Sequence, residues 1–258
     1  MIIQPQKSWN ILLIGDACLD VYHYGVCERM SPEAPVPVFK ELRQEIKPGM
    51  SHNVKLNLES FGINVTHRCN KESILKHRFI ENSYNQQLFR YDEGEGSHVK
   101  PMTPFTFGAY DFNAVVISDY DKGFVTEQSF NILRKQLGSW VPIFVDSKKK
   151  DLRMFKDCII KINESEASKA VTDSTQEVIT TLGPDGAQWK NNIFETDKVN
   201  MFDVCGAGDV FLSSLVYGYL TRRNIPDAIK LANKCASLSV TKMGTYVLTK
   251  EDLNDLCF

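Results

Sequence analysis

The sequence predicts an α/β protein with a mostly parallel central sheet and helices on both faces. Short apolar runs alternate along the chain with segments of helical periodicity, which is the pattern of repeated strand–helix–strand units. The apolar runs end in polar residues, as strands do where such folds bind ligands. A hydrophobic content of 43% with 24% charged residues suits a globular enzyme.

Five apolar runs are expected to form the parallel strands. Their composition is typical of strands that are buried on both faces of a sheet. The runs are residues 10–15, 114–118, 142–145, 158–162 and 177–182, and the polar or glycine residues at their ends are Asp16, Asp119, Asp146, Asn163 and Gly183.

Four segments between or after these runs have apolar residues at helical spacing. In the first, Val54, Leu58 and Phe61 fall on one face. The predicted helices are residues 51–61, 126–137, 209–220 and 227–243.

Two segments, residues 22–47 and 77–91, break the alternation. The first contains Pro32, Pro35 and Pro37 and reads as extended, and the second alternates in part between apolar and polar residues. Together they are expected to form a small antiparallel sheet that covers the active edge as a lid, whose free edge could pair with another subunit. The alternative is two ordinary hairpins of the main sheet. Without repeats or low-complexity linkers, residues 1–258 are expected to form one domain with the lid inserted.

Composition excludes several classes of protein. The 30 basic and 32 acidic residues give a net charge of −2 without a basic block, so nucleic acid is not an expected partner. No apolar stretch reaches the roughly 20 residues of a membrane span, and residues 1–10 lack a signal-peptide core.

The seven scattered cysteines, without a Cys-x-x-Cys pair, indicate reduced thiols and a cytoplasmic location. Cys205 is a candidate reactive thiol because it precedes a helix.

Residues 203–209, Asp-Val-Cys-Gly-Ala-Gly-Asp, form a glycine-rich turn that leads directly into an apolar helical segment. Small residues let backbone N–H groups approach an anion, and a helix N-terminus adds partial positive charge. A carboxylate at this point, Asp209, suggests a base that acts on a hydroxyl while the amides hold a phosphoryl group. The alternative is a plain turn in which Asp209 only completes the helix N-terminus.

The same turn, with several other segments, resembles the ribokinase/PfkB family of carbohydrate kinases, whose signature is Asp-Thr-x-Gly-Ala-Gly-Asp. Within the family, the likeness is greatest to the heptose-7-phosphate kinase subgroup and runs over about residues 10–253. The segments that carry it are residues 15–22, 29–38, 85–90, 118–123, 145–148, 231–233 and 242–245. The resemblance implies a ribokinase-like three-layer α/β/α sandwich with a β-sheet lid.

The resemblance also implies catalytic roles. Asp209 would take the proton from the sugar hydroxyl, and Gly206, Ala207 and Gly208 would form the anion hole for the transferred phosphoryl group. Asn163 and Glu166 match an Asn-x-x-Glu element that helps to place Mg²⁺ and phosphates, with Glu166 near the metal. From composition alone, Glu166 reads instead as a solvated residue at an acidic helix start.

For the nucleotide, the resemblance implies ATP with Mg²⁺, and in parts of the family a monovalent cation. Asn233 would lie near adenine or ribose, although alone it is only a polar helix residue. Lys148 and Lys122 would neutralise phosphate charge, although isolated lysines are usually solvated. The other residues assigned to the nucleotide side are Thr181, Gly183 and Gly186, in a turn beside the phosphates, and Asp203, which begins the signature.

For the acceptor, the resemblance points to the first strand and the lid. Asp20 would hydrogen-bond sugar hydroxyls, because a carboxylate accepts two donors in fixed geometry. A sugar phosphate also needs a cation, which Arg78 or Arg90 would supply. The full set of predicted acceptor residues is Asp20, Tyr22, Gly49, Asn53, Asn85, Gln87, Arg90 and Asp209.

Three positions depart from the family pattern. Its Gly-Gly-Ala-Ala-Asn-Val is here Gly-Met-Ser-His-Asn-Val at 49–54, so Met50 and His52 change the sugar pocket, although His52 also reads as a surface residue at a helix start. Val204 replaces a threonine.

Three hypotheses for the function follow from the sequence: an ATP-dependent kinase similar to heptose-7-phosphate kinase, a kinase of another small alcohol such as a nucleoside, and a catalytically silent sugar or nucleotide sensor.

Overall fold

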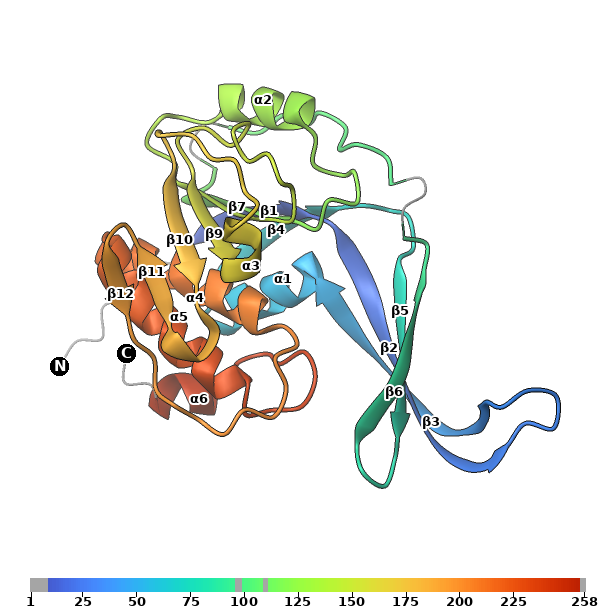
Figure 1. The fold of residues 1–258 in the computed structure, drawn as a ribbon. Helices are drawn as coiled ribbons and strands as arrows, with labels where there is room; N and C mark the ends of the chain where they lie inside the picture. Colours follow the sequence, from blue (N-terminus) through green and yellow to red (C-terminus); the bar gives the residue numbers. More distant parts are fainter. Residues whose placement is uncertain (1–8, 96–98, 109–110, 256–258) are drawn as a thin grey trace.

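Two sheets and the helices around them make up the fold (Figure 1). A computed structural model of the chain describes residues 9–95, 99–108 and 111–255. The larger sheet has eight strands in the order β12-β11-β10-β9-β8-β7-β1-β4. From β4 to β10 all neighbours are parallel, and β11 and β12 are antiparallel. The strands are β1 (Asn10–Gly15), β4 (Asn64–Cys69), β7 (Ala114–Asp119), β8 (Ile143–Ser147), β9 (Ile159–Asn163), β10 (Glu177–Thr181), β11 (Ala187–Trp189) and β12 (Asn192–Phe194).

Helices pack on both faces of this sheet, which confirms the predicted α/β class. On β1, Ile11 and Leu13 join a core with α1, α4 and α5, while Leu12 and Ile14 join a second core with α2. The alternation follows from the two-residue period of a strand. The helices are α1 (Ser51–Ser60), α2 (Glu127–Gln136), α3 (Glu164–Ala167), α4 (Ala207–Arg222), α5 (Ile225–Ser239) and α6 (Lys250–Asp255), with a 3₁₀ turn, η1 (Gly183–Asp185).

Side-chain caps explain several helix starts. Thr126 and Ser129 form a capping box at α2, and Asn224 accepts the backbone N–H of Asp227 at the start of α5. The helix predicted over 227–243 therefore begins two residues earlier and ends at Ser239, and the helix predicted over 209–220 begins at Ala207.

The smaller sheet stands beside the larger one (Figure 1) and has the order β3-β2-β5-β6. A lid sheet was expected, but its limits and pairing differ from the prediction. Its central pair, β2 and β5, is parallel, so the sheet is mixed and not antiparallel. Its strands extend beyond the predicted segments 22–47 and 77–91: β2 (Ala17–Met30), β3 (Pro37–Met50), β5 (Leu75–Glu81) and β6 (Gln86–Glu93).

Several short elements were not predicted from the sequence. β4, β11 and β12 and the helices α3 and α6 are too short or too polar to give a clear period. Within the described residues, no helix has the length and apolarity needed to cross a bilayer. The predictions about residues 1–8 and about Cys257 lie outside the described residues, in which the other six cysteines are unpaired.

Candidate active site

A cavity of about 960 Å³ opens at the carboxyl ends of the parallel strands, next to the start of α4. Its lining brings together most of the residues predicted for catalysis and for the nucleotide. These are Lys148, Asn163, Thr181, Gly183, Gly186, Gly206, Ala207, Gly208, Asp209 and Asn233.

The glycine turn is shaped by positions where a side chain would not fit. Gly206 precedes α4 with φ +78°, and a Cβ there would lie 2.8 Å from the Asn53 amide nitrogen. A Cβ on Gly208 would lie 2.8 Å from Nζ of Lys161. The turn thus lets a lysine ammonium and an amide approach the backbone closely.

Two backbone N–H groups of this turn are free to bind an anion. Among the described residues, the N–H groups of Gly206 and Gly208 have no hydrogen-bond partner, whereas those of Ala207 and Asp209 donate to the carbonyls of Val204 and Gly206. Unpaired donors at a helix N-terminus are suited to a phosphoryl oxygen. The structure therefore offers two of the three predicted anion-hole amides, and the N–H of Ala207 is already engaged.

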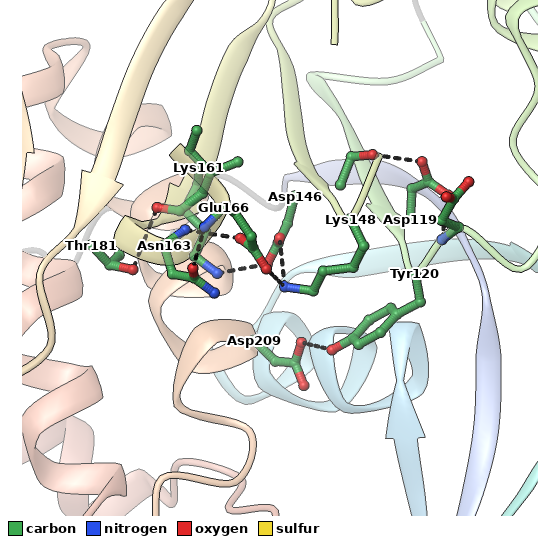
Figure 2. Close-up of polar contacts among 12 residues, drawn as sticks. Asp119, Tyr120, Asp146, Lys148, Lys161, Asn163, Glu166, Thr181 and Asp209 are labelled. Carbon is green, nitrogen blue, oxygen red and sulfur yellow. Dashed lines mark hydrogen bonds and ion pairs between the residues drawn. The ribbon is translucent and has the colours of Figure 1, made fainter. Parts of the chain in front are cut away.

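Asp209 is buried, with 4% of its surface exposed, and both carboxylate oxygens accept hydrogen bonds. Nδ2 of Asn53 donates to Oδ2 at 2.9 Å, and the hydroxyl of Tyr120 donates to Oδ1 at 2.9 Å (Figure 2). Burial raises the pKa of Asp209 to about 6, and Asp146 adds to the rise, while Asn53, Lys161 and Tyr120 oppose it. A carboxylate with this pKa is ionised at neutral pH and is well matched to taking a proton.

A buried ion pair lies beside the base. Lys161, from the middle of β9, donates to Asp146 at 2.6 Å, and both residues are less than 7% exposed. Burial would raise the pKa of Asp146, but Lys161 and Lys148 outweigh it, and the pKa is lowered. Lys148 also pairs with Glu166, so two lysine ammonium groups stand at this end of the cavity (Figure 2).

Asn163 and Glu166 contact each other as a capping box at α3. The Asn163 side chain accepts the N–H of Glu166 at 2.8 Å, and the Glu166 carboxylate accepts the N–H of Asn163 at 2.9 Å. One carboxylate oxygen of Glu166 is thereby occupied by Asn163 and the other by Lys148. By contrast, Oδ1 of Asp146 is buried, makes no hydrogen bond to any residue that the structure describes, and lies 3.7 Å from Nζ of Lys148.

The nucleotide side of the cavity is held in place by structural contacts. Gly186 has φ +93°, and a Cβ there would collide with the carbonyl of Phe194 at 2.0 Å. Asn233 donates to the same Phe194 carbonyl at 2.6 Å. Asp203 accepts the N–H groups of Cys205 and Gly244, each at 2.9 Å, and so ties the glycine turn to the segment after α5.

On the acceptor side, Asp20 is buried and paired with Arg78, which donates at 2.9 and 3.1 Å to one carboxylate oxygen. A Cβ on Gly49 would lie 2.2 Å from the other oxygen of Asp20, so β3 approaches this carboxylate through a glycine. Tyr22, on the same face of β2, lies beneath Lys47 and Arg78, whose charged groups stand 5.3 and 5.8 Å from its ring.

Strand pairing places the lid residues on two faces. Asp20 pairs with Lys47 and Lys76, and Arg78 pairs with Arg90. Residues opposite one another in a sheet share a face, so Lys47, Lys76, Arg78 and Arg90 form one cationic face of the lid. Gln87 also approaches Arg78, at 3.4 Å, whereas Asn85 lies in the exposed turn after β5 with φ +52°. Asn85, Gln87 and Arg90 are exposed and are not among the residues that line the cavity.

Three site residues were not assigned a role from the sequence. Lys161 carried a recognisable signal, since it interrupts the apolar run Ile-Ile-Lys-Ile, and Asp146 was noted only as a strand end. Tyr120 had no local signal, because its contact with Asp209 joins residues far apart in the chain. The hypothesis of a reactive Cys205 is wrong: burial raises the pKa of its thiol, and although Arg78 opposes this, Asp20, Asp203 and Asp209 add to it.

Comparison with known proteins places the chain in a family. The model of the pfkB family carbohydrate kinases matches residues 51–252. The bifunctional protein HldE of Nitratiruptor sp. is 29% identical over 304 residues, which cover 95% of this chain and 64% of the relative, and that of Proteus mirabilis is 29% identical over 301 residues, which cover 95% and 63%. The chain thus spans about two thirds of the length of these relatives, and the alignments, longer than its 258 residues, include segments that it lacks.

Solved structures agree on the fold. Ribokinase from Thermotoga maritima superposes with a TM-score of 0.71 at 14% identity, over 96% of this chain and 99% of that one. Phosphofructokinase-2 from Escherichia coli, in complex with potassium, gives a TM-score of 0.70 at 14% identity, over 96% and 98%. The chain belongs to the pfkB family of carbohydrate kinases and has the ribokinase-like fold.

Proposed function

We propose that the chain transfers the γ-phosphoryl group of ATP to a hydroxyl of a sugar phosphate, as a heptose-7-phosphate kinase does. The observation that carries this proposal is the carboxylate of Asp209 beside the unpaired N–H groups of Gly206 and Gly208. A base and an anion hole on the same helix turn are what phosphoryl transfer to a hydroxyl needs.

In this mechanism Asp209 accepts the proton of the acceptor hydroxyl as the oxygen attacks phosphorus. Asn53 and Tyr120 hold the carboxylate in position, since each donates to a different oxygen. The amides of Gly206 and Gly208 bind the oxygens of the transferred group, and Nζ of Lys161 lies next to them. These contacts stabilise the charge of the transition state without covalent chemistry.

Magnesium, when bound with ATP, supplies positive charge to the β- and γ-phosphates. The donor set fits such an ion: Mg²⁺ keeps several waters and needs few carboxylates, and Asp146 lines the cavity with an Oδ1 that makes no hydrogen bond among the described residues. Glu166, the ligand expected from the sequence, accepts one hydrogen bond from Lys148 and one from Asn163, so the metal or its waters would share its remaining lone pairs. Asp146 therefore joins Glu166 as a candidate ligand of the metal or of its waters. Potassium dependence of the activity would test the expected monovalent cation.

The cationic face of the lid supports an acceptor that carries a phosphate. Arg78 and Arg90 stand opposite each other on neighbouring strands, where like charges are unfavourable unless an anion joins them. Asp20, Glu45, Asp92 and Glu95 pair with cations of this face and neutralise part of its charge. The face meets the segment after α5 at Gly244, where an added Cβ would lie 3.2 Å from the Tyr22 hydroxyl and 3.6 Å from Nζ of Lys47. The N–H of Gly244 donates to Asp203 at the start of the glycine turn.

ADP release with Mg-ATP, measured on a panel of acceptors, tests this function. D-glycero-D-manno-heptose 7-phosphate should be turned over, together with other sugar phosphates to a lesser extent, and Asp209→Asn should lower kcat by about a hundredfold or more. Turnover of nucleosides or free sugars alone would favour a kinase of another alcohol. Binding of ATP without turnover of any acceptor would favour the sensor hypothesis.

Arg90→Gln tests the phosphate subsite. It should raise KM for a sugar phosphate about tenfold, since one charge-assisted hydrogen bond is lost, and leave KM for ATP unchanged. Arg29→Gln, at the exposed far end of β2, is the matched control. Equal effects of the two substitutions would place the acceptor phosphate elsewhere.

We also propose that the lid joins two copies of the chain. Its second face, opposite the cationic one, is formed by Ile46, His77, Phe79, Phe89 and Tyr91, and three of these apolar or aromatic side chains are more than half exposed. Phe79 stacks on Phe89 with ring centroids 4.2 Å apart. An exposed aromatic face on a sheet with free edges favours association.

A further inference from the structure

A second group of ligand-type side chains lies outside the kinase cavity, between α1 and the edge strand β4. His52 is the second residue of α1, and His67 and Cys69 lie two residues apart on β4, so their side chains leave the same face of the strand. One ligand atom from each residue lies within 4.8 Å of the other two. The rings of His52 and His67 meet edge to face with centroids 5.0 Å apart.

From this geometry we propose that His52, His67 and Cys69 bind one zinc ion. Two imidazoles and a thiolate are ligands that Zn²⁺ accepts, and three protein ligands leave a fourth position for water. Ligand atoms around such an ion are about 3.5 Å apart, given metal–ligand distances of 2.0–2.3 Å. The ligand atoms must therefore move closer together by up to about 1.3 Å, which rotamer adjustment can supply.

The surroundings of the cluster favour binding. Nδ1 of His52 is buried without a hydrogen bond in the described part of the chain, although the backbone of Cys18 interacts with the ring and partly offsets the lowering of its pKa by burial. Ser51 Oγ lies 3.0 Å from Nε2 of His67 and orients that ring, as neighbours of metal ligands commonly do. All three residues are partly exposed, so an ion can enter from solvent.

The position of the site links it to the kinase. His52 is adjacent in sequence to Asn53, which donates to the base Asp209, and follows the end of β3, where Gly49 lies against Asp20. A metal ion on His52 would anchor the first turn of α1 to the sheet edge. That turn has no side-chain cap of its own. The ion is thus expected to stabilise the fold and is distinct from the Mg²⁺ of the nucleotide.

Titration of the untagged 258-residue chain with zinc alone tests the proposal. Excess Mg²⁺ in the buffer occupies oxygen-rich sites, and a chromophoric chelator reports free zinc. One equivalent should bind with Kd below about 10 µM, and zinc at 100 times Kd should raise Tm by about 5–10 °C. Co²⁺ should give a thiolate-to-cobalt charge-transfer band and intense d–d bands typical of a tetrahedral site.

His52→Ala and Cys69→Ser should each weaken zinc affinity about a hundredfold or more, since changes to residues that only support a ligand already cost 10–100-fold. Cys69→Ser should also abolish the charge-transfer band. Alanine stands at the His52 position in the family pattern, so His52→Ala should fold, and its Tm without zinc checks this. Cys27→Ser, on the lid, is the control. Binding that is absent in the wild type, or equal in the wild type and both variants, would overturn the proposal.

Discussion

Asp209 shows how one buried residue couples activity to pH. Its pKa of about 6 lies above the ordinary value of 3.8 because burial disfavours the carboxylate. The base must be ionised to accept a proton, so kcat/KM should rise tenfold per pH unit below about pH 6 and level off above it. A pH profile of kcat/KM with saturating Mg-ATP measures this limb.

Tyr120→Phe should shift the rise of kcat/KM (the acid limb of the pH profile) to higher pH, because the tyrosine hydroxyl stabilises the ionised form of Asp209. The expected shift is up to about one unit. Tyr219→Phe removes a hydroxyl from a ring that packs edge-on against Phe144 and serves as the control. An unchanged limb in Tyr120→Phe would mean that Asp209 is not the titrating group.

The same pKa has a consequence for stability. Because the folded-state pKa is raised, Asp209 contributes stability below its unfolded pKa of 3.8, and this contribution is lost as pH rises through about 6. Asp209→Asn should therefore increase the free energy of unfolding at pH 8 by about 1–3 kcal/mol, while lowering kcat by about a hundredfold or more. Asparagine can still accept from Asn53 and donate to the Tyr120 oxygen. Urea denaturation at pH 8 and pH 5 tests the sign, since the gain should shrink at pH 5.

Met50 occupies a backbone conformation, φ +54° and ψ −131°, that glycine adopts far more readily. The strain costs about 1–3 kcal/mol, and burial of the side chain against Cys18 and Ile74 offsets it.

Met50→Gly should thus be more stable than Met50→Ala by about 1 kcal/mol, the reverse of the usual order, since both lose burial but only glycine relieves the strain. Guanidinium denaturation of both variants measures this. An alanine variant as stable as the glycine variant, or more so, would show that position 50 is unstrained.

At the scale of elements, the carboxyl ends of β7, β8 and β9 and the start of α4 act together. β9 is buried along most of its length, yet it places Lys161 against Asp146 and next to Gly208. A buried pair of this kind contributes little by itself but is costly to break, because the remaining charge has no water to solvate it.

Lys161→Met should lower the free energy of unfolding by about 3 kcal/mol and reduce kcat, as it leaves Asp146 with only Lys148 nearby. Adding Asp146→Asn should recover most of the stability but not the activity. Lys169→Met, exposed after α3, should change neither quantity. A Lys161→Met variant as stable as the wild type would contradict the assignment of Lys161 and Asp146 as a tightly coupled pair. Urea denaturation and ADP release give the two readouts.

At the scale of the whole molecule, the lid presents its cationic face to the glycine turn and its aromatic face away from it. If the aromatic face joins two copies, Ile46→Glu with Phe89→Glu should convert a dimer to a monomer, because burying two carboxylates in an apolar interface is unfavourable. Sedimentation velocity over a range of concentrations tests this. Ile193→Glu, exposed on β12 at the other end of the large sheet, is the control. A wild-type chain that stays monomeric at high concentration would contradict the dimer.

The sequence by itself determined the class of fold, the five main parallel strands and the glycine turn before Asp209. These features depend on local signals: apolar runs of strand length, helical periodicity, and glycines where a side chain would collide. Only the tertiary structure decided which side chains meet. Tyr120 and Asn53 reach Asp209 from distant segments, and the parallel pairing of β2 with β5 sets Arg78 beside Asp20. Such contacts depend on the packing of separate elements, and no periodicity within one segment encodes them.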